Sequence, residues 1–123
     1  MSLRDALLQR IHSGEATIGV IGLGYVGLPL ALAFAETFRT VGFDVDPAKV
    51  ALLSQGGCYL QHIAPERVAA ALRTDRFKAS ADFTLLKRCD AIVICVPTPL
   101  TENRDPDLSY VARTTQALSL IHI

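Results

Sequence analysis

Residues 18–34 read IGVIGLGYVGLPLALAF, an apolar run that breaks at three glycines and then resumes with helical spacing. Together with Thr17, its first residues, up to Ile21, predict a buried strand, and the residues from Tyr25 onward predict a helix. The apolar face expected for this helix comprises Val26, Leu30, Ala33, Phe34 and Phe38. A glycine-rich connection between a strand and a helix is typical of a turn at which a ligand can approach the main chain.

The glycines of this turn are Gly22, Gly24 and Gly27, and their spacing is G-x-G-x-x-G. Between a strand and a helix this spacing is typical of a dinucleotide-binding loop. The first glycine allows the tight turn, the second lets a pyrophosphate approach, and the third allows helix and strand to pack closely. The phosphates would meet free N–H groups at the positive end of the helix dipole. The alternative is that the glycines serve packing alone.

An acidic residue at the end of the expected second strand, TVGFD at residues 40–44, favours nucleotide binding. Asp44 lies 20 residues after Gly24, where a carboxylate can accept hydrogen bonds from both adenosine ribose hydroxyls. It would also repel a 2′-phosphate, which favours NAD over NADP. Asp46 is explained as a helix cap. Lys49 would flank the same ribose or lie solvated on its helix.

Strands and helices alternate along the rest of the chain. A helix carrying Leu3, Leu7, Leu8 and Ile11 precedes the first strand and is expected to pack on the domain. The elements expected after the second strand are helices at 47–55 and 65–72, a strand at 77–80, a short helix capped by Ser80 or Asp82, a strand at 90–99 and a helix at 108–118. This order predicts an α/β fold with a Rossmann-like, doubly wound parallel sheet. The nearly continuous apolar run at 90–99 predicts a central strand buried on both faces.

Composition limits the possible partners. Half of the 123 residues are hydrophobic, and the 12 basic residues balance the 12 acidic ones. No basic stripe indicates nucleic acid, and no apolar run is long enough for a membrane span. We therefore expect a cytoplasmic globular domain that binds a small molecule.

The cysteines and histidines do not form a recognisable reactive or metal-binding pattern. We expect Cys89 and Cys95 to be small core residues and Cys58 to lie in a loop after two glycines. Surface or loop positions are expected for His12, His62 and His122. The sequence thus predicts no metal site and no catalytic residue in this chain.

Several phrases together resemble a known family: GVIGLGYVGLPLA, GFDVDPAKV, GGCYLQHI and CVPTPLTENRDPDLSYV. They resemble the amino-terminal part of the UDP-glucose/GDP-mannose dehydrogenase family, from about Thr17 to Leu118. Within the family they look most like the UDP-N-acetylglucosamine 6-dehydrogenase branch. The resemblance implies NAD as cofactor. It implies a pyrophosphate loop of Gly22, Gly24, Tyr25, Val26 and Gly27, a ribose site of Asp44 and Lys49, and nicotinamide contacts from Pro97 and Thr98.

Members of this family oxidise C6 of a UDP-sugar twice, to the uronate, for polysaccharide biosynthesis. The second oxidation uses a cysteine thioester in a Gly-Gly-x-Cys-like context that these 123 residues lack, and Cys58 is not its equivalent. We therefore expect a fragment that is inactive alone, from a parent that is a homo-oligomer. It would comprise a helical appendage at 1–16 and a partial NAD-binding domain at 17–123, without a substrate domain.

Two other interpretations stay open from the sequence. One is a non-catalytic module that binds NAD or packs against a partner through an exposed sheet edge. The other is a fragment of a hydroxyacid or hydroxyacyl dehydrogenase with the same nucleotide fold.

Overall fold

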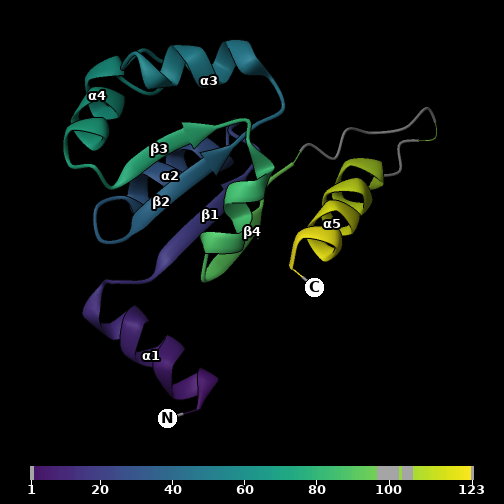
Figure 1. Cartoon of the computed structure of the whole chain (residues 1–123). Coiled ribbons are helices and arrows are strands. Elements are labelled where there is room, and N and C mark those ends of the chain that lie inside the picture. The colour runs from purple at the N-terminus through teal and green to yellow at the C-terminus, as the bar shows by residue number, and fades with distance from the viewer. Residues whose placement is uncertain (1, 97–102, 104–106, 123) are drawn as a thin grey trace.

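A four-stranded parallel sheet forms the centre of the molecule (Figure 1). The computed structural model describes residues 2–96, 103 and 107–122. The strand order is β3-β2-β1-β4, and all three neighbouring pairs are parallel. The strands are β1 (Thr17–Ile21), β2 (Arg39–Phe43), β3 (Phe77–Ser80) and β4 (Ala91–Ile94). The expected parallel α/β sheet is therefore confirmed.

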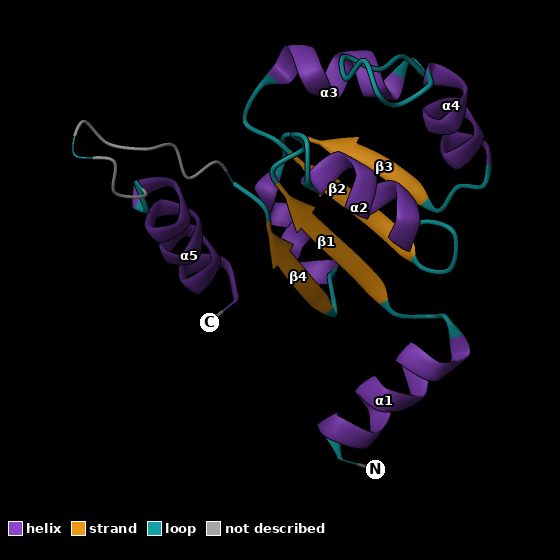
Figure 2. Cartoon of the chain, turned by 180° about the vertical axis from the view of Figure 1, so that it is seen from behind, coloured by secondary structure: helices purple, strands orange, loops and turns teal. Residues whose placement is uncertain are grey.

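Helical segments cover both faces of this sheet. The helices are α1 (Leu3–Ser13), α2 (Gly27–Phe34), α3 (Pro47–Ser54), α4 (Pro65–Arg73), the 3₁₀ helix η1 (Phe83–Arg88) and α5 (Ser109–His122). Seen from the two opposite sides, α2 crosses one face, and η1 lies against the other near β4 (Figures 1 and 2). One apolar cluster joins the sheet to α2, α3 and α4, and a second joins it to η1 and α5. The sheet thus lies between two apolar layers, as a doubly wound fold requires.

Local signals begin α3 and η1 where the sequence predicts. The Asp46 carboxylate accepts a hydrogen bond from the Ala48 N–H at 3.0 Å and caps α3, in which Pro47 is the first residue. Asp82 likewise accepts from the Thr84 N–H at 3.1 Å and caps η1. Ser80, the alternative cap, instead accepts from the Asp82 N–H.

The buried face of α2 differs from the predicted one. The residues that enter the core are Leu28, Ala31, Leu32 and then Ala35, all at most 3% exposed. Of the residues expected there, Val26 is 69% exposed, Ala33 is exposed, and the other three, Leu30, Phe34 and Phe38, are only half-buried. The helix begins at Gly27, so its apolar i, i+3, i+4, i+7 stripe starts at position 28. Val26 precedes the helix and faces outward.

The β4 strand is also less buried than predicted. It lies at one edge of the described sheet, beside β1. Ala91 is exposed, and Ile92, Val93 and Ile94 are only half-buried. On its η1 side, Ile92 and Ile94 belong to the second apolar cluster, which includes Leu118 of α5. The prediction of a central strand buried on both faces is therefore wrong for β4 in the described sheet.

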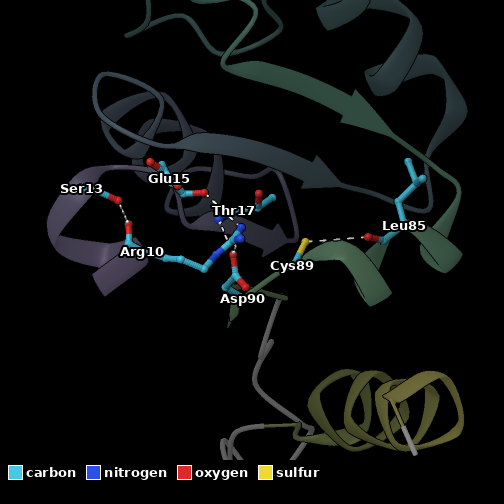
Figure 3. A network of polar contacts seen from close by, with 7 residues as sticks. All are labelled: Arg10, Ser13, Glu15, Thr17, Leu85, Cys89 and Asp90. Atoms are coloured by element: carbon cyan, nitrogen blue, oxygen red, sulfur yellow. Dashed lines mark hydrogen bonds and ion pairs between the residues drawn. The ribbon is translucent and has the colours of Figure 1, made fainter. Parts of the chain in front are cut away.

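The α1 helix forms as expected, but none of its residues is buried. Its apolar side chains, Leu3, Leu7, Leu8 and Ile11, are 36–92% exposed. Polar contacts hold it instead: Arg10 donates to the Asp90 carboxylate at 3.0 Å and to the Glu15 carbonyl at 3.2 Å (Figure 3). The same carboxylate accepts from the Thr17 N–H at 2.8 Å. Asp90 thus joins α1 to the start of β1. In the described ranges no helix is long and apolar enough to cross a bilayer.

Candidate functional site

The carboxyl ends of three parallel strands meet at one edge of the sheet. The Gly22 N–H donates to the Phe43 carbonyl at 2.8 Å, and the Cys95 N–H donates to the Ile21 carbonyl at 2.7 Å. A cavity of about 760 Å³ opens at this edge. In doubly wound sheets, ligands bind outside the carboxyl ends of the strands.

Residues 22–27 form the glycine loop, of which residues 22–26 line one side of this cavity. Its three glycines differ in what a side chain would meet there. Gly22 has a φ of +97°, and a Cβ there would lie 2.5 Å from the Cys95 carbonyl oxygen. A Cβ at Gly27 would fall on the carbonyl oxygen of Gly22. A Cβ at Gly24 would meet no atom within 4 Å. The packing of the fold therefore does not require a glycine at position 24, in contrast to positions 22 and 27.

The glycine loop presents a row of backbone donors. No described residue accepts a hydrogen bond from the N–H groups of Gly24, Tyr25, Val26 or Gly27. The α2 helix that follows has no side-chain cap at its start. Free amides at a helix start, together with the positive end of its dipole, bind phosphate groups. The donor set therefore fits a pyrophosphate.

Asp44 lies directly beside these amides. Its Oδ2 accepts from the Leu23 N–H at 3.0 Å, and its Oδ1 accepts from the Asp46 N–H at 2.9 Å. A carboxylate offers about four acceptor positions. Two of these positions are thus left for hydroxyl groups of a ligand.

Lys49 and Tyr59 form a second pair near Asp44. The Lys49 Nζ lies 5.4 Å from the ring centroid of Tyr59, and Lys49 lines the cavity together with Asp44. The Tyr59 hydroxyl donates to the Leu23 carbonyl. Burial raises the pKa of Tyr59 well above its usual value, and the charge of Asp44 raises it further. The phenol therefore keeps its proton and stays a donor.

The residues predicted for the site come together in part. Gly22, Gly24, Tyr25, Val26, Asp44 and Lys49 all line the cavity. Gly27, the last residue of the glycine loop, is buried and does not line the cavity. Pro97 and Thr98 lie outside the described residues.

Sequence reasoning missed several residues at this site. Tyr59 and His62 come from the connection between α3 and α4, where CYLQHI gave a family resemblance but no role. The His62 ring stacks on Tyr25, with centroids 5.7 Å apart and an interplanar angle of 11°. The opposite wall comes from η1 and α5 and consists of Phe83, Tyr110, Arg113 and Thr114. These contacts join segments far apart in the sequence, so helical or strand spacing could not reveal them.

Burial disfavours the thiolate form of two of the three cysteines. Cys95 lines the cavity, and burial raises the pKa of its thiol. Burial also raises the pKa of Cys89 to about 11, with a smaller contribution from Asp90. Cys58 is half-buried, and its Sγ lies 3.7 Å from the Leu60 carbonyl oxygen. Among the residues that the structure describes, no three His, Cys, Asp or Glu side chains gather as a metal site.

Comparison with known proteins agrees with this geometry. The family model of the UDP-glucose/GDP-mannose dehydrogenase family, NAD binding domain, matches residues 16–122. UDP-N-acetyl-D-glucosamine 6-dehydrogenase of Pseudomonas aeruginosa is 34% identical over 109 residues, which are 87% of this chain and 25% of that protein. UDP-N-acetyl-D-mannosamine dehydrogenase of Pyrococcus horikoshii is 35% identical over 106 residues, 83% of this chain and 25% of that protein.

Solved structures show the same fold. A GDP-mannose dehydrogenase from Pseudomonas aeruginosa superposes with a TM-score of 0.81 at 28% identity, over 85% of this chain and 24% of that one. A UDP-glucose dehydrogenase from Pyrobaculum islandicum gives 0.81 at 33% identity, over 86% and 25%. The chain thus spans about a quarter of the length of these relatives. It belongs to the UDP-glucose/GDP-mannose dehydrogenase family, in which residues 16–122 match the domain that binds NAD.

Proposed function

We propose that this chain is the NAD⁺-binding part of a nucleotide-sugar 6-dehydrogenase that oxidises C6 of UDP-N-acetylglucosamine to the uronate. The observation that carries the proposal is the position of the Asp44 carboxylate, bonded to the Leu23 N–H beside the free amides of the glycine loop. Relatives named for UDP-N-acetyl-D-glucosamine support this sugar, while others of similar identity are named for UDP-N-acetyl-D-mannosamine.

Different residues of the chain are proposed to bind different parts of the cofactor. The amides of Gly24, Tyr25 and Val26 would hold the pyrophosphate at the start of α2. Asp44 and Lys49 would hold the adenosine ribose, and Asp44 would reject a 2′-phosphate by charge repulsion. When bound, NAD⁺ supplies a hydride acceptor at its nicotinamide ring. Thr98, next to Pro97, is proposed to lie beside that ring.

The proposed net reaction is RCH₂OH + 2 NAD⁺ + H₂O → RCOO⁻ + 2 NADH + 3 H⁺. Each oxidation removes one hydride from C6, and the water oxygen enters in the second. We propose that the 123-residue chain binds NAD⁺ but does not carry out this reaction alone. For Cys89 and Cys95 the raised thiol pKa values support this, because burial disfavours the nucleophilic thiolate.

Calorimetric titration of the chain with NAD⁺ and with NADP⁺ tests the cofactor assignment. We expect saturable binding of NAD⁺ at one site and at least tenfold weaker binding of NADP⁺. No heat change with NAD⁺ in a folded sample, shown by circular dichroism, would remove the proposal for this chain.

The sugar is tested with the longest gene product that contains this chain. NADH absorbance at 340 nm would be followed with UDP-N-acetylglucosamine, UDP-N-acetylmannosamine, UDP-glucose and GDP-mannose. The proposal predicts the highest kcat/KM for UDP-N-acetylglucosamine and two NADH per sugar. A higher kcat/KM for another nucleotide sugar would contradict the assignment of UDP-N-acetylglucosamine as the substrate. Formation of one NADH per sugar would contradict the double oxidation.

A further inference from the structure

The connection between α3 and α4 crosses from the core to the glycine loop. Its middle part, the Cys58–Ile63 loop, is fixed by Leu60 and Ile63, which are 7% and 3% exposed in the main core cluster. Two aromatic residues next to these anchors, Tyr59 and His62, contact the glycine loop. A segment more than 30 residues away in sequence is thus attached to the phosphate-binding backbone.

Tyr59 determines the orientation of one peptide unit in that backbone. Its hydroxyl donates to the Leu23 carbonyl, while the Leu23 N–H is held by Asp44 at 3.0 Å. Both polar groups of Leu23 are therefore bonded to side chains. Because the peptide group is planar and trans, a fixed Leu23 carbonyl also fixes the Gly24 N–H, which points the opposite way. The free amides of Tyr25 and Val26 follow directly from this peptide.

His62 holds the next part of the same loop. Its exposed ring stacks on that of Tyr25, which is 76% exposed. Stacked rings at this distance attract one another beyond the area that they bury. Tyr25 would otherwise lie free on the surface, so the stack limits the motion of the residue whose amide follows Gly24.

We propose that Tyr59 is a positioning residue for the pyrophosphate, and that His62 assists it. The two side chains hold the glycine loop in its donor arrangement before the cofactor arrives. Donors ordered in advance bind an anion more tightly, because binding then loses less conformational freedom. The inference rests on the NAD⁺ binding proposed above. The Tyr59 hydroxyl suits the role, because its raised pKa keeps the proton in place throughout the physiological range.

The test is the variant Tyr59→Phe, made in the full 123-residue chain. It keeps the ring, and with it the core packing and the contact to Lys49, and removes only the donor to the Leu23 carbonyl. Dissociation constants would be measured by NMR titration for NAD⁺ and for adenosine, which lacks phosphate. Loss of one hydrogen bond predicts a three- to tenfold weaker NAD⁺ affinity (about 0.7–1.4 kcal/mol) and unchanged adenosine affinity.

The variant His62→Ala gives a second measurement, since an exposed side chain can be removed without loss of the fold. We expect about a two- to fivefold loss of NAD⁺ affinity and again none for adenosine. Ser13→Ala, which also removes a hydroxyl bonded to a backbone carbonyl but lies on α1, is the matched control and should bind both ligands as the parent chain does.

The inference is overturned if Tyr59→Phe binds NAD⁺ as the parent chain does, or if it loses NAD⁺ and adenosine affinity equally. Equal losses would mean a structural role only. If Tyr59→Phe does not fold, unchanged NAD⁺ binding by His62→Ala overturns the inference. Absence of NAD⁺ binding in the parent chain would instead refute the proposed function, so the two failures are distinguishable.

Discussion

Two glycine substitutions in the same loop should have opposite effects on stability and binding. Gly24→Ala adds a methyl group where no atom lies within 4 Å, whereas Gly27→Ala places one on the Gly22 carbonyl oxygen. The first methyl group enters the space of the pyrophosphate and leaves the fold intact. The second forces α2 and the turn apart. The pair thus separates the role of a glycine in binding from its role in folding.

The expected magnitudes follow from these contacts. At Gly27 the collision is with backbone, which cannot rotate away, so we expect a loss of about 3 kcal/mol or more. For a chain of this size that lowers the Tm by about 12 °C. At Gly24 the Tm should stay within about 2 °C. Displacing the pyrophosphate there loses at least one hydrogen bond to a charged group, about 1.5–3 kcal/mol, or roughly 10- to 100-fold in NAD⁺ affinity.

Thermal unfolding by circular dichroism and calorimetric titration with NAD⁺ measure both quantities. The reasoning requires Gly24→Ala to melt as the parent chain does and to bind at least tenfold more weakly. It is refuted if Gly24→Ala binds NAD⁺ normally, because the open space at Gly24 would then not be the phosphate site. It is equally refuted if Gly27→Ala melts as the parent chain does.

Three further predictions concern charges and ionisation. Asp44→Asn should lower NAD⁺ affinity about tenfold and reduce the preference for NAD⁺ over NADP⁺, in titrations with both; an unchanged preference would contradict the role of its charge. Arg10→Ala should change the free energy of unfolding by less than about 1 kcal/mol and speed tryptic cleavage within residues 1–16, without changing NAD⁺ affinity; equal cleavage would show that the Asp90 contact does not hold α1. Burial raises the pKa of Cys89 from 9.0 to about 11, so the stability that its neutral thiol contributes is complete below pH 9 and is lost as pH rises toward 11. Between pH 9 and 11 the free energy of unfolding, measured with urea, should therefore decline less in Cys89→Ala than in the parent chain. Equal declines in the two proteins would argue against the shift.

The sequence was most informative where structure is set by near neighbours. Asp46 followed by Pro47 correctly begins α3, and the strand at 77–80 has the predicted bounds. Gly22, Gly24 and Asp44 line one cavity, because the carboxyl ends of adjacent parallel strands meet at one edge. The family resemblance and NAD were also confirmed.

The sequence was least informative where burial depends on distant segments. The prediction of which face of α2 is buried was wrong. Apolar residues occur on both sides of that helix, and those that pack in the core are Leu28, Ala31 and Leu32. The position of β4 at an edge, and the contact of Tyr59 with Leu23, follow from which elements neighbour one another. Periodicity within a segment carries no record of such neighbours.

The central claim is that the free amides of the glycine loop receive the pyrophosphate of NAD⁺. Two-dimensional ¹H–¹⁵N NMR of the labelled chain, recorded while NAD⁺ is added, reports on each amide directly. The account predicts that the largest shifts fall on Gly24, Tyr25 and Val26, with downfield movement of their protons as they bond to phosphate oxygens. Saturable NAD⁺ binding that leaves these three signals in place would contradict it.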